Sequence, residues 1–269
     1  MRLHKRKIII FTLLFIFSLI SLSQGNTLIA VYDPSVDGNG LVNEKYSDIS
    51  SCSIDINDVR FPKVRRNDDN LYHGDKVLEI LNKLVRINQC IVVGSENKDD
   101  IENLGKAIDY AHYQGAKVFL MTYNIFDNFG LFRRQFYYDI ISFCSKYPEM
   151  TFIISAGNES MDLKALDEED KQDNLIVVGS CNDKGIISSF SNRGDFVDLY
   201  TLGEINLSTG QVLRGTSFSA PIVAAYCSYI YDNIKDISGK EVKNKILEFT
   251  NNKFMLSYEL IDKIVKEVQ

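Results

Sequence analysis

Four polar residues have the types and positions that a hydrolase with a covalent intermediate requires. His73 precedes apolar residues at helical spacing and Ser217 opens a long apolar run, whereas Asp33 and Asn158 each follow a short apolar run typical of a buried strand. A serine becomes a nucleophile when a base takes its proton and an acid orients that base. An asparagine amide can donate to the oxyanion that forms on the attacked carbonyl. These residue types predict acyl transfer through Ser217.

Each of these residues also has a purely structural interpretation. A serine at a helix start is ordinarily an N-cap, and the first N–H groups of that helix favour any negative charge placed before them. Asp33 and Asn158 can be ordinary turn residues, and His73 can be a surface or capping histidine. Of the three histidines, His4 lies in the basic N-terminal segment before residue 8, and His112 lies inside a predicted helix. His73 is therefore the one histidine that the pattern places at a junction.

The elements around these residues alternate between apolar β-rich runs and longer amphipathic runs. The predicted strands are residues 28–32, 90–93, 117–121, 151–155, 175–178 and 196–200. The predicted helices are residues 74–86, 99–113, 132–147, 217–234, 238–249 and 256–268. Such alternation predicts an α/β fold with three layers, α/β/α, around a mainly parallel sheet. Active groups of parallel sheets gather at the carboxyl ends of the strands, where Asp33 and Asn158 are expected.

The segment around Ser217 carries its own turn chemistry. Gly215 permits a sharp turn before the helix, and Pro221 is expected in the first helical turn, where a missing N–H costs no hydrogen bond.

Taken together, these motifs resemble the subtilisin-like serine peptidases. The serine pattern of that family appears as Gly215-Thr-Ser-Phe-Ser-Ala-Pro221, and Ser155-Ala-Gly-Asn158 is similar to its oxyanion segment. His73-Gly74 before a helix resembles its histidine motif. Val177-Val-Gly-Ser180 and Ser188-Ser-Phe-Ser-Asn-Arg-Gly194 resemble the segments that join the asparagine to the serine. The likeness spans about residues 28–235 and follows the Asp, His, Ser order that is known from subtilisin itself.

The resemblance implies a role for each residue. Ser217 attacks the peptide carbonyl, His73 takes its proton, Asp33 orients His73, and the Asn158 side chain with the Ser217 N–H binds the oxyanion. The cleft for a protein or peptide substrate is expected along the backbone of Thr122, Tyr123, Asn124, Ser155, Ala156 and Gly157. No cofactor is implied.

Three departures from the family pattern leave a second function open. The family's Asp-[Ser/Thr]-Gly is Asp33-Pro34-Ser35 here, and proline removes a backbone donor beside the acid. Lys76 replaces the usual second histidine, and Thr122-Tyr-Asn124 replaces the Ser-Leu-Gly stretch that edges the substrate cleft. The alternative is a catalytically inactive subtilisin-like protein that binds peptides.

A competing interpretation of Asp33 is a calcium loop. Residues 33–44 match the EF-hand spacing at Asp33, Ser35, Asp37, Gly38 and Glu44. The EF-hand needs a helix before the loop, but residues 28–32 predict a strand. Gly40 also occupies the position that is normally apolar. The pattern therefore favours a turn aspartate or a triad acid over a calcium ligand, and no metal site is predicted.

The N-terminus predicts export. A basic start precedes the uncharged, nearly apolar residues 8–22, and small polar residues follow, as in a cleaved signal peptide. We expect residues 1–25 to be this signal and residues 26–269 to be one peptidase domain, secreted or periplasmic. The alternative is a membrane anchor formed by residues 8–22. The first predicted strand follows at once, which leaves no room for a pro-domain. We therefore expect the enzyme to fold unaided or with a separate folding helper or inhibitor.

The net charge bears on the class of binding partner, and the cysteine content bears on disulfide formation. The formal net charge is −6, and it becomes −10 without residues 1–25, which hold four basic and no acidic residues. So acidic a chain argues against a nucleic-acid partner. The five cysteines include no CxxC pair, and their odd number and apolar surroundings favour buried free thiols over disulfides.

Overall fold

The centre of the molecule is a six-stranded parallel sheet. The computed structural model describes residues 24–25, 27–33, 73–84, 86–87, 90–93, 101–122, 125, 133–162, 172–206, 212–250 and 253–255. Across the sheet the strands run β4 (Cys90–Val93), β2 (Ile29–Tyr32), β5 (Val118–Met121), β6 (Thr151–Ser155), β7 (Leu175–Cys181) and β8 (Leu199–Leu202). Every neighbouring pair is parallel, so the carboxyl ends of all six strands share one edge.

Successive side chains along each strand point to opposite faces of the sheet and belong to two separate hydrophobic cores. In β2, Ile29 and Val31 enter one core while Ala30 and Tyr32 enter the other. The same alternation holds in β5, where Val118 and Leu120 oppose Phe119 and Met121. A strand buried on both faces needs apolar residues at every position, which explains the unbroken apolar runs in the sequence.

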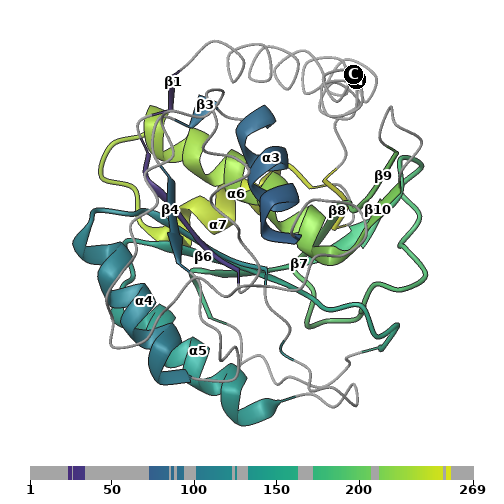
Figure 1. Ribbon diagram of the computed structural model, residues 1–269, viewed down its shortest axis with the longest axis horizontal. Coiled ribbons are helices and arrows are strands. Elements are labelled where there is room, and N and C mark those ends of the chain that lie inside the picture. Colours follow the sequence, from purple (N-terminus) through teal and green to yellow (C-terminus); the bar gives the residue numbers. More distant parts are fainter. Residues whose placement is uncertain are drawn as a thin grey trace, which may run out of the picture.

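Helices cover both faces of the sheet. One face carries α3 (His73–Leu84), α6 (Thr216–Asn233) and α7 (Gly239–Glu248), and the other carries α4 (Ile101–Tyr113) and α5 (Arg134–Lys146). Figure 1 shows the two helical layers on opposite sides of the strands. The predicted three-layer α/β/α fold is confirmed.

Two small pairings were not predicted from the sequence. The strand β1 (Gln24–Gly25) pairs in parallel with β3 (Arg86–Ile87), and β9 (Glu204–Asn206) pairs in antiparallel fashion with β10 (Val212–Arg214). Each strand is two or three residues long, too short to establish a periodic pattern. The second pairing leads the chain into Gly215 and the start of α6.

The last two strands of the sheet differ from the predicted ranges. Strand β8 begins at Leu199 instead of residue 196, because Phe196 and Val197 belong to a turn in which the Val197 N–H donates to the Gly194 carbonyl. Strand β7 continues through Gly179 to Cys181. The Tyr200 ring occupies the space beside Gly179, so a Cβ there would lie 2.5 Å from a Tyr200 ring carbon.

The expectation for Pro221 was wrong. The helix α6 begins at Thr216, so Pro221 is its sixth residue and lies in the second turn. An N–H at this position would have bonded to the Ser217 carbonyl, and proline removes that bond.

Several predictions fall outside the described residues. These are the signal peptide or anchor, the helix at 256–268, Cys52 and the part of the calcium loop that follows Asp33. Among the described residues, no helix is both long and apolar enough to cross a membrane, and no group of three metal-ligating side chains occurs. Free, buried thiols are confirmed for Cys144, Cys181 and Cys227.

Candidate active site

His73 bridges Asp33 and Ser217. Its Nδ1 lies 2.8 Å from Asp33 Oδ2, and its Nε2 lies 2.7 Å from Ser217 Oγ. An ionised carboxylate only accepts hydrogen bonds, so Nδ1 carries the ring proton and Nε2 is left to accept the Ser217 hydroxyl. The structure thus joins three of the residues singled out in the sequence into one hydrogen-bonded line.

The fold brings these three residues together from distant parts of the chain. Asp33 follows β2 at the carboxyl edge of the sheet, His73 is the first residue of α3, and Ser217 is the second residue of α6. The two helices contribute to the same core on one face of the sheet, which holds their first residues beside each other. The His73 and Phe218 rings pack at 5.4 Å between centroids and strengthen this contact.

Solvent reaches the three residues unequally. Asp33 is completely buried, Ser217 is 7% exposed, and the His73 side chain is 35% exposed. The acid is thus shielded from water, while one side of the imidazole remains open to the surface. An ionised carboxylate in such a place needs hydrogen-bond donors.

Thr122 supplies a second donor to the acid. Its hydroxyl donates to Asp33 Oδ2 at 2.6 Å, the oxygen that also faces His73. Thr122 directly follows β5, the neighbour of β2, and its N–H donates to the Tyr32 carbonyl at 3.3 Å. Its place beside the acid therefore follows from strand pairing.

Charges around His73 tune its basicity. Burial by itself lowers the pKa of His73, but the hydrogen bond and the negative charge of Asp33 raise it, against a smaller lowering by the positive charge of Lys76. The net pKa lies above the ordinary value of 6.5. A raised pKa means that the imidazolium formed by taking the serine proton is stabilised in place.

The turn before α6 leaves the serine hydroxyl room. A Cβ at Gly215 would lie 3.2 Å from Ser217 Oγ, so any larger residue would crowd the hydroxyl. The Ser217 N–H belongs to the first helical turn, whose N–H groups have no partner within a helix. That N–H and the helix dipole favour negative charge in front of Ser217.

Asn158 is held with its amide nitrogen turned outward. Its Oδ1 accepts from the Thr216 N–H at 2.9 Å and from the Thr216 hydroxyl at 3.2 Å. A backbone N–H can only donate, so the amide oxygen must face Thr216 and the Nδ2 group must point away. Asn158 is exposed, and it follows Gly157, whose φ of 96° lies in the left-handed region that favours glycine.

Of the other predicted site residues, Ser155, Ala156 and Gly157 are described, and they directly precede Asn158. Ser155 and Ala156 are buried at and just beyond the end of β6, and Gly157 donates its N–H to the Thr216 hydroxyl at 3.2 Å. Tyr123 and Asn124, predicted for the substrate cleft, lie outside the described residues.

Two roles were not predicted from the sequence. Thr216 was part of the recognised serine motif, but its hydrogen bonds to Asn158 join residues that are 58 positions apart in the chain. Thr122 was expected only to line the cleft, whereas its hydroxyl contacts the acid. A threonine directly after a strand neighbouring the acid's strand was the available signal.

His112, assigned to a helix face, stacks on Tyr147 at 4.2 Å between centroids.

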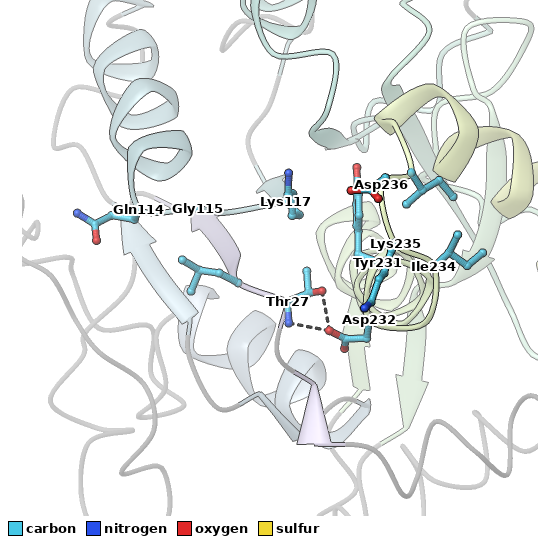
Figure 2. A pocket seen from close by; sticks show the side chains of 11 residues that line it. Thr27, Gln114, Gly115, Lys117, Tyr231, Asp232, Ile234, Lys235 and Asp236 are labelled. Carbon is cyan, nitrogen blue, oxygen red and sulfur yellow. Dashed lines mark hydrogen bonds between the residues drawn. The ribbon is translucent and has the colours of Figure 1, made fainter.

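A cavity of about 520 Å³ lies at the opposite, amino-terminal edge of the sheet. Figure 2 shows Thr27 on one wall, with its N–H and hydroxyl donating to Asp232 Oδ1 at 2.8 and 2.7 Å, and Lys117 on another. None of the predicted site residues lines it.

Comparisons with known proteins identify the family of the chain. The sequence model of the subtilase family matches residues 83–260, more than half of the chain, a range that includes Asn158 and Ser217 but begins after Asp33 and His73. The chain is 32% identical over 102 residues to subtilisin-like protease 1 of Arthroderma otae. It is 29% identical over 118 residues to the subtilase-type proteinase psp3 of Schizosaccharomyces pombe. These matches cover 36% and 41% of this chain but only 21% and 24% of the relatives' lengths.

Solved structures share the fold at low sequence identity. The nisin leader peptidase NisP from Lactococcus lactis is 16% identical, with a TM-score of 0.63 over 92% of this chain and 90% of that one. A cold-adapted subtilisin-like serine proteinase is 18% identical, with a TM-score of 0.63 over 88% and 90%. Together with the family match, this likeness shows that the chain belongs to the subtilase family of serine proteases.

Proposed function

We propose that the chain is an active serine endopeptidase that hydrolyses peptide bonds through an acyl-enzyme. The observation that carries this proposal is the position of His73, with one ring nitrogen 2.8 Å from Asp33 and the other 2.7 Å from Ser217. These distances are within the hydrogen-bond reach that proton transfer from a serine requires.

Each step of the reaction has a residue assigned to it. The Ser217 oxygen bonds to the substrate carbonyl carbon as its proton moves to His73 Nε2, and Asp33 stays ionised and stabilises the imidazolium. His73 then protonates the leaving amine as the peptide C–N bond breaks. Water attacks the acyl-enzyme by the same route in reverse and releases the acid and free Ser217.

The oxyanion is the second element of the proposal. We assign the Asn158 Nδ2 group and the Ser217 N–H as its donors, because Thr216 fixes the amide oxygen on the other side. The peptide substrate is proposed to lie along residues 122–124 and 155–157.

Asp33-Pro34-Ser35 was one of the departures behind the inactive peptide-binding alternative. The hydroxyl of Thr122 provides a donor to Asp33 that does not depend on residue 34. This observation favours the active form.

Turnover of a broad peptide library distinguishes the two functions. We expect the wild type to cleave members of the library and the Ser217→Ala and His73→Ala variants to fall to near-background rates. Tight binding of peptides by the wild type without cleavage would establish the inactive alternative.

Export remains part of the proposal. We propose that residues 1–25 are removed as a signal peptide and that residues 26–269 act outside the cytoplasm. Sequencing of the mature N-terminus checks this. An intact N-terminus in a membrane fraction would indicate instead that residues 8–22 anchor the protein.

A further inference from the structure

Asn192 is a completely buried residue between β7 and β8 that grips the turn bearing Asn158. Its Nδ2 donates to the Ala156 carbonyl at 2.9 Å and to Glu159 Oε2 at 2.7 Å. Its Oδ1 accepts from the Met161 N–H at 2.8 Å. Every hydrogen bond of this side chain thus ends on residues 156–161, on both sides of the oxyanion donor.

The backbone of Asn192 adds to this grip. Its N–H donates to the Gly157 carbonyl at 3.1 Å, and its carbonyl accepts from the Ser191 hydroxyl at 2.9 Å. The Ser191 oxygen in turn accepts from the Ser180 N–H of β7 at 2.9 Å. A continuous line of hydrogen bonds therefore ties the Asn158 turn to the central sheet.

The turn needs such support. Asn158 itself is exposed, so packing around its own side chain does little to fix it. Gly157 before it has a wide range of backbone conformations, and the turn would be free to shift without outside contacts. An oxyanion donor must be held to within about 0.5 Å of the productive geometry to be effective.

We propose that Asn192 is a positioning residue that sets the place of the Asn158 amide, an inference that rests on the proposed peptidase function. Asn192 does not touch the substrate. Asn192 binds the carbonyls of Ala156 and Gly157 and the N–H of Met161. The backbone is therefore fixed on both sides of Asn158, and this restricts the position of the Asn158 side chain.

Asn174 offers a matched control. It is also a buried asparagine, 2% exposed, and its Nδ2 donates to three backbone carbonyls, those of Cys144, Tyr147 and Met150. These contacts lie at the amino end of the strands, away from the triad. Asn174→Ala therefore removes a similar set of buried bonds without touching the Asn158 turn.

The test is a double-mutant cycle on kcat in the full chain. Asn192→Ala should lower kcat about 10-fold, a part of the roughly 100- to 1,000-fold that removal of an oxyanion donor itself costs, with little change in KM. In an Asn158→Ala background the same substitution should cost almost nothing further, because the positioned group is gone. Asn174→Ala should leave kcat unchanged. Equal losses in both backgrounds, or an equal loss from Asn174→Ala, would overturn the inference.

A compensating pair covers the case in which Asn192→Ala does not fold. Asn192→Asp loses both donors and places a second carboxylate against Glu159. Adding Glu159→Gln supplies a donor from the other side and should recover part of the lost kcat. A kcat of the double variant no higher than that of Asn192→Asp alone would contradict the positioning role of Asn192.

Amide hydrogen exchange separates this inference from the proposed function. Asn192→Ala should speed exchange at Met161 and its neighbours, whereas Asn174→Ala should not. Unchanged protection at Met161 would overturn the positioning role even in an active enzyme. If Asn192→Ala speeds exchange at Met161 but the wild type cleaves no peptide, the peptidase proposal is rejected and the structural role of Asn192 is retained.

Discussion

The Thr122 hydroxyl donates to Asp33 Oδ2 at 2.6 Å, the carboxylate oxygen that His73 Nδ1 contacts at 2.8 Å. Two donors from different elements therefore converge on one oxygen of a completely buried acid. Hydrogen bonds to an ionised group are stronger than neutral ones, and they stabilise its charged form. Thr122 gives Asp33 a support that the proline at position 34 cannot give through its backbone.

Replacement of Thr122 by valine should weaken the peptidase without abolishing it. The change keeps the shape but removes the donor, and a hydrogen bond to a charged group is worth about 1.5–3 kcal/mol, which sets an upper bound of roughly 100-fold on the loss in kcat/KM. Thr122→Ser should retain most activity. Steady-state kinetics of both variants, with Thr151→Val as a buried threonine control at the amino edge, provide the check. Equal activity of Thr122→Val and wild type would contradict the role.

The charge of Lys76 should shift the acid limb of the pH profile of kcat/KM. The net pKa of His73 is raised, so activity should fall as pH drops through a value above 6.5, where the base becomes protonated. Lys76 opposes this rise. Lys76→Met should therefore raise the pKa of His73 further and move the acid limb of kcat/KM to higher pH, with the alkaline plateau kept.

Measurement of kcat/KM against pH at low salt checks that prediction. Lys106→Met is a suitable control, because Lys106 lies on α4 and pairs with Glu102 at 2.7 Å. A shift of the acid limb to lower pH in Lys76→Met would show that Lys76 does not lower the pKa of His73.

Thr216 should matter through Asn158. Thr216→Val removes the hydroxyl that donates to Asn158 Oδ1 at 3.2 Å and accepts from Gly157, but it keeps the backbone N–H that donates to the same oxygen. The bond to Asn158 is one neutral hydrogen bond, worth about 1 kcal/mol, and the Gly157 N–H loses its acceptor as well, so kcat should fall at least about 5-fold with KM nearly constant. A loss confined to KM would show that Thr216 acts on binding instead.

Gly215 should tolerate no side chain. Gly215→Ala places a Cβ 3.2 Å from Ser217 Oγ and should turn the hydroxyl away from His73. At this distance the hydroxyl must move by a few tenths of an ångström. Because a 1 Å misplacement of a reacting group can cost about 100-fold in rate, a several-fold fall in kcat is expected from this smaller shift. Wild-type kcat in this variant would show that the hydroxyl has space that the structure does not give it.

The sequence pointed to Asp33, His73, Asn158 and Ser217 through the family resemblance and through their places at strand ends and helix starts. Asp33 and Asn158 come after strands whose apolar runs were easy to recognise, and parallel strands bring such positions to one edge. His73 begins a helix with apolar residues at helical spacing, and Ser217 is the second residue of a helix that is apolar along most of its length. The strands β4 and β6 have the predicted bounds, and the helices differ by only a few residues at their ends.

The supporting contacts could not be read in the same way. Thr122 reaches Asp33 across 89 residues, and Asn192 reaches Ala156 across 36, through side-chain directions set by tertiary packing. The stretch around Asn192 resembles the family, but no local pattern in it points to the turn at residues 156–161. The hairpin of β9 and β10 was missed because three-residue strands carry almost no periodic signal.

Labelling with a fluorophosphonate probe tests the activation of Ser217 most directly. The probe bonds to an activated serine oxygen with loss of fluoride, and mass spectrometry identifies the modified residue. We expect one probe per chain on Ser217 in the wild type, much slower labelling in His73→Ala, and none in Ser217→Ala. Equal labelling of the wild type and Ser217→Ala, or no labelling of a folded wild type, would contradict a nucleophilic role for Ser217.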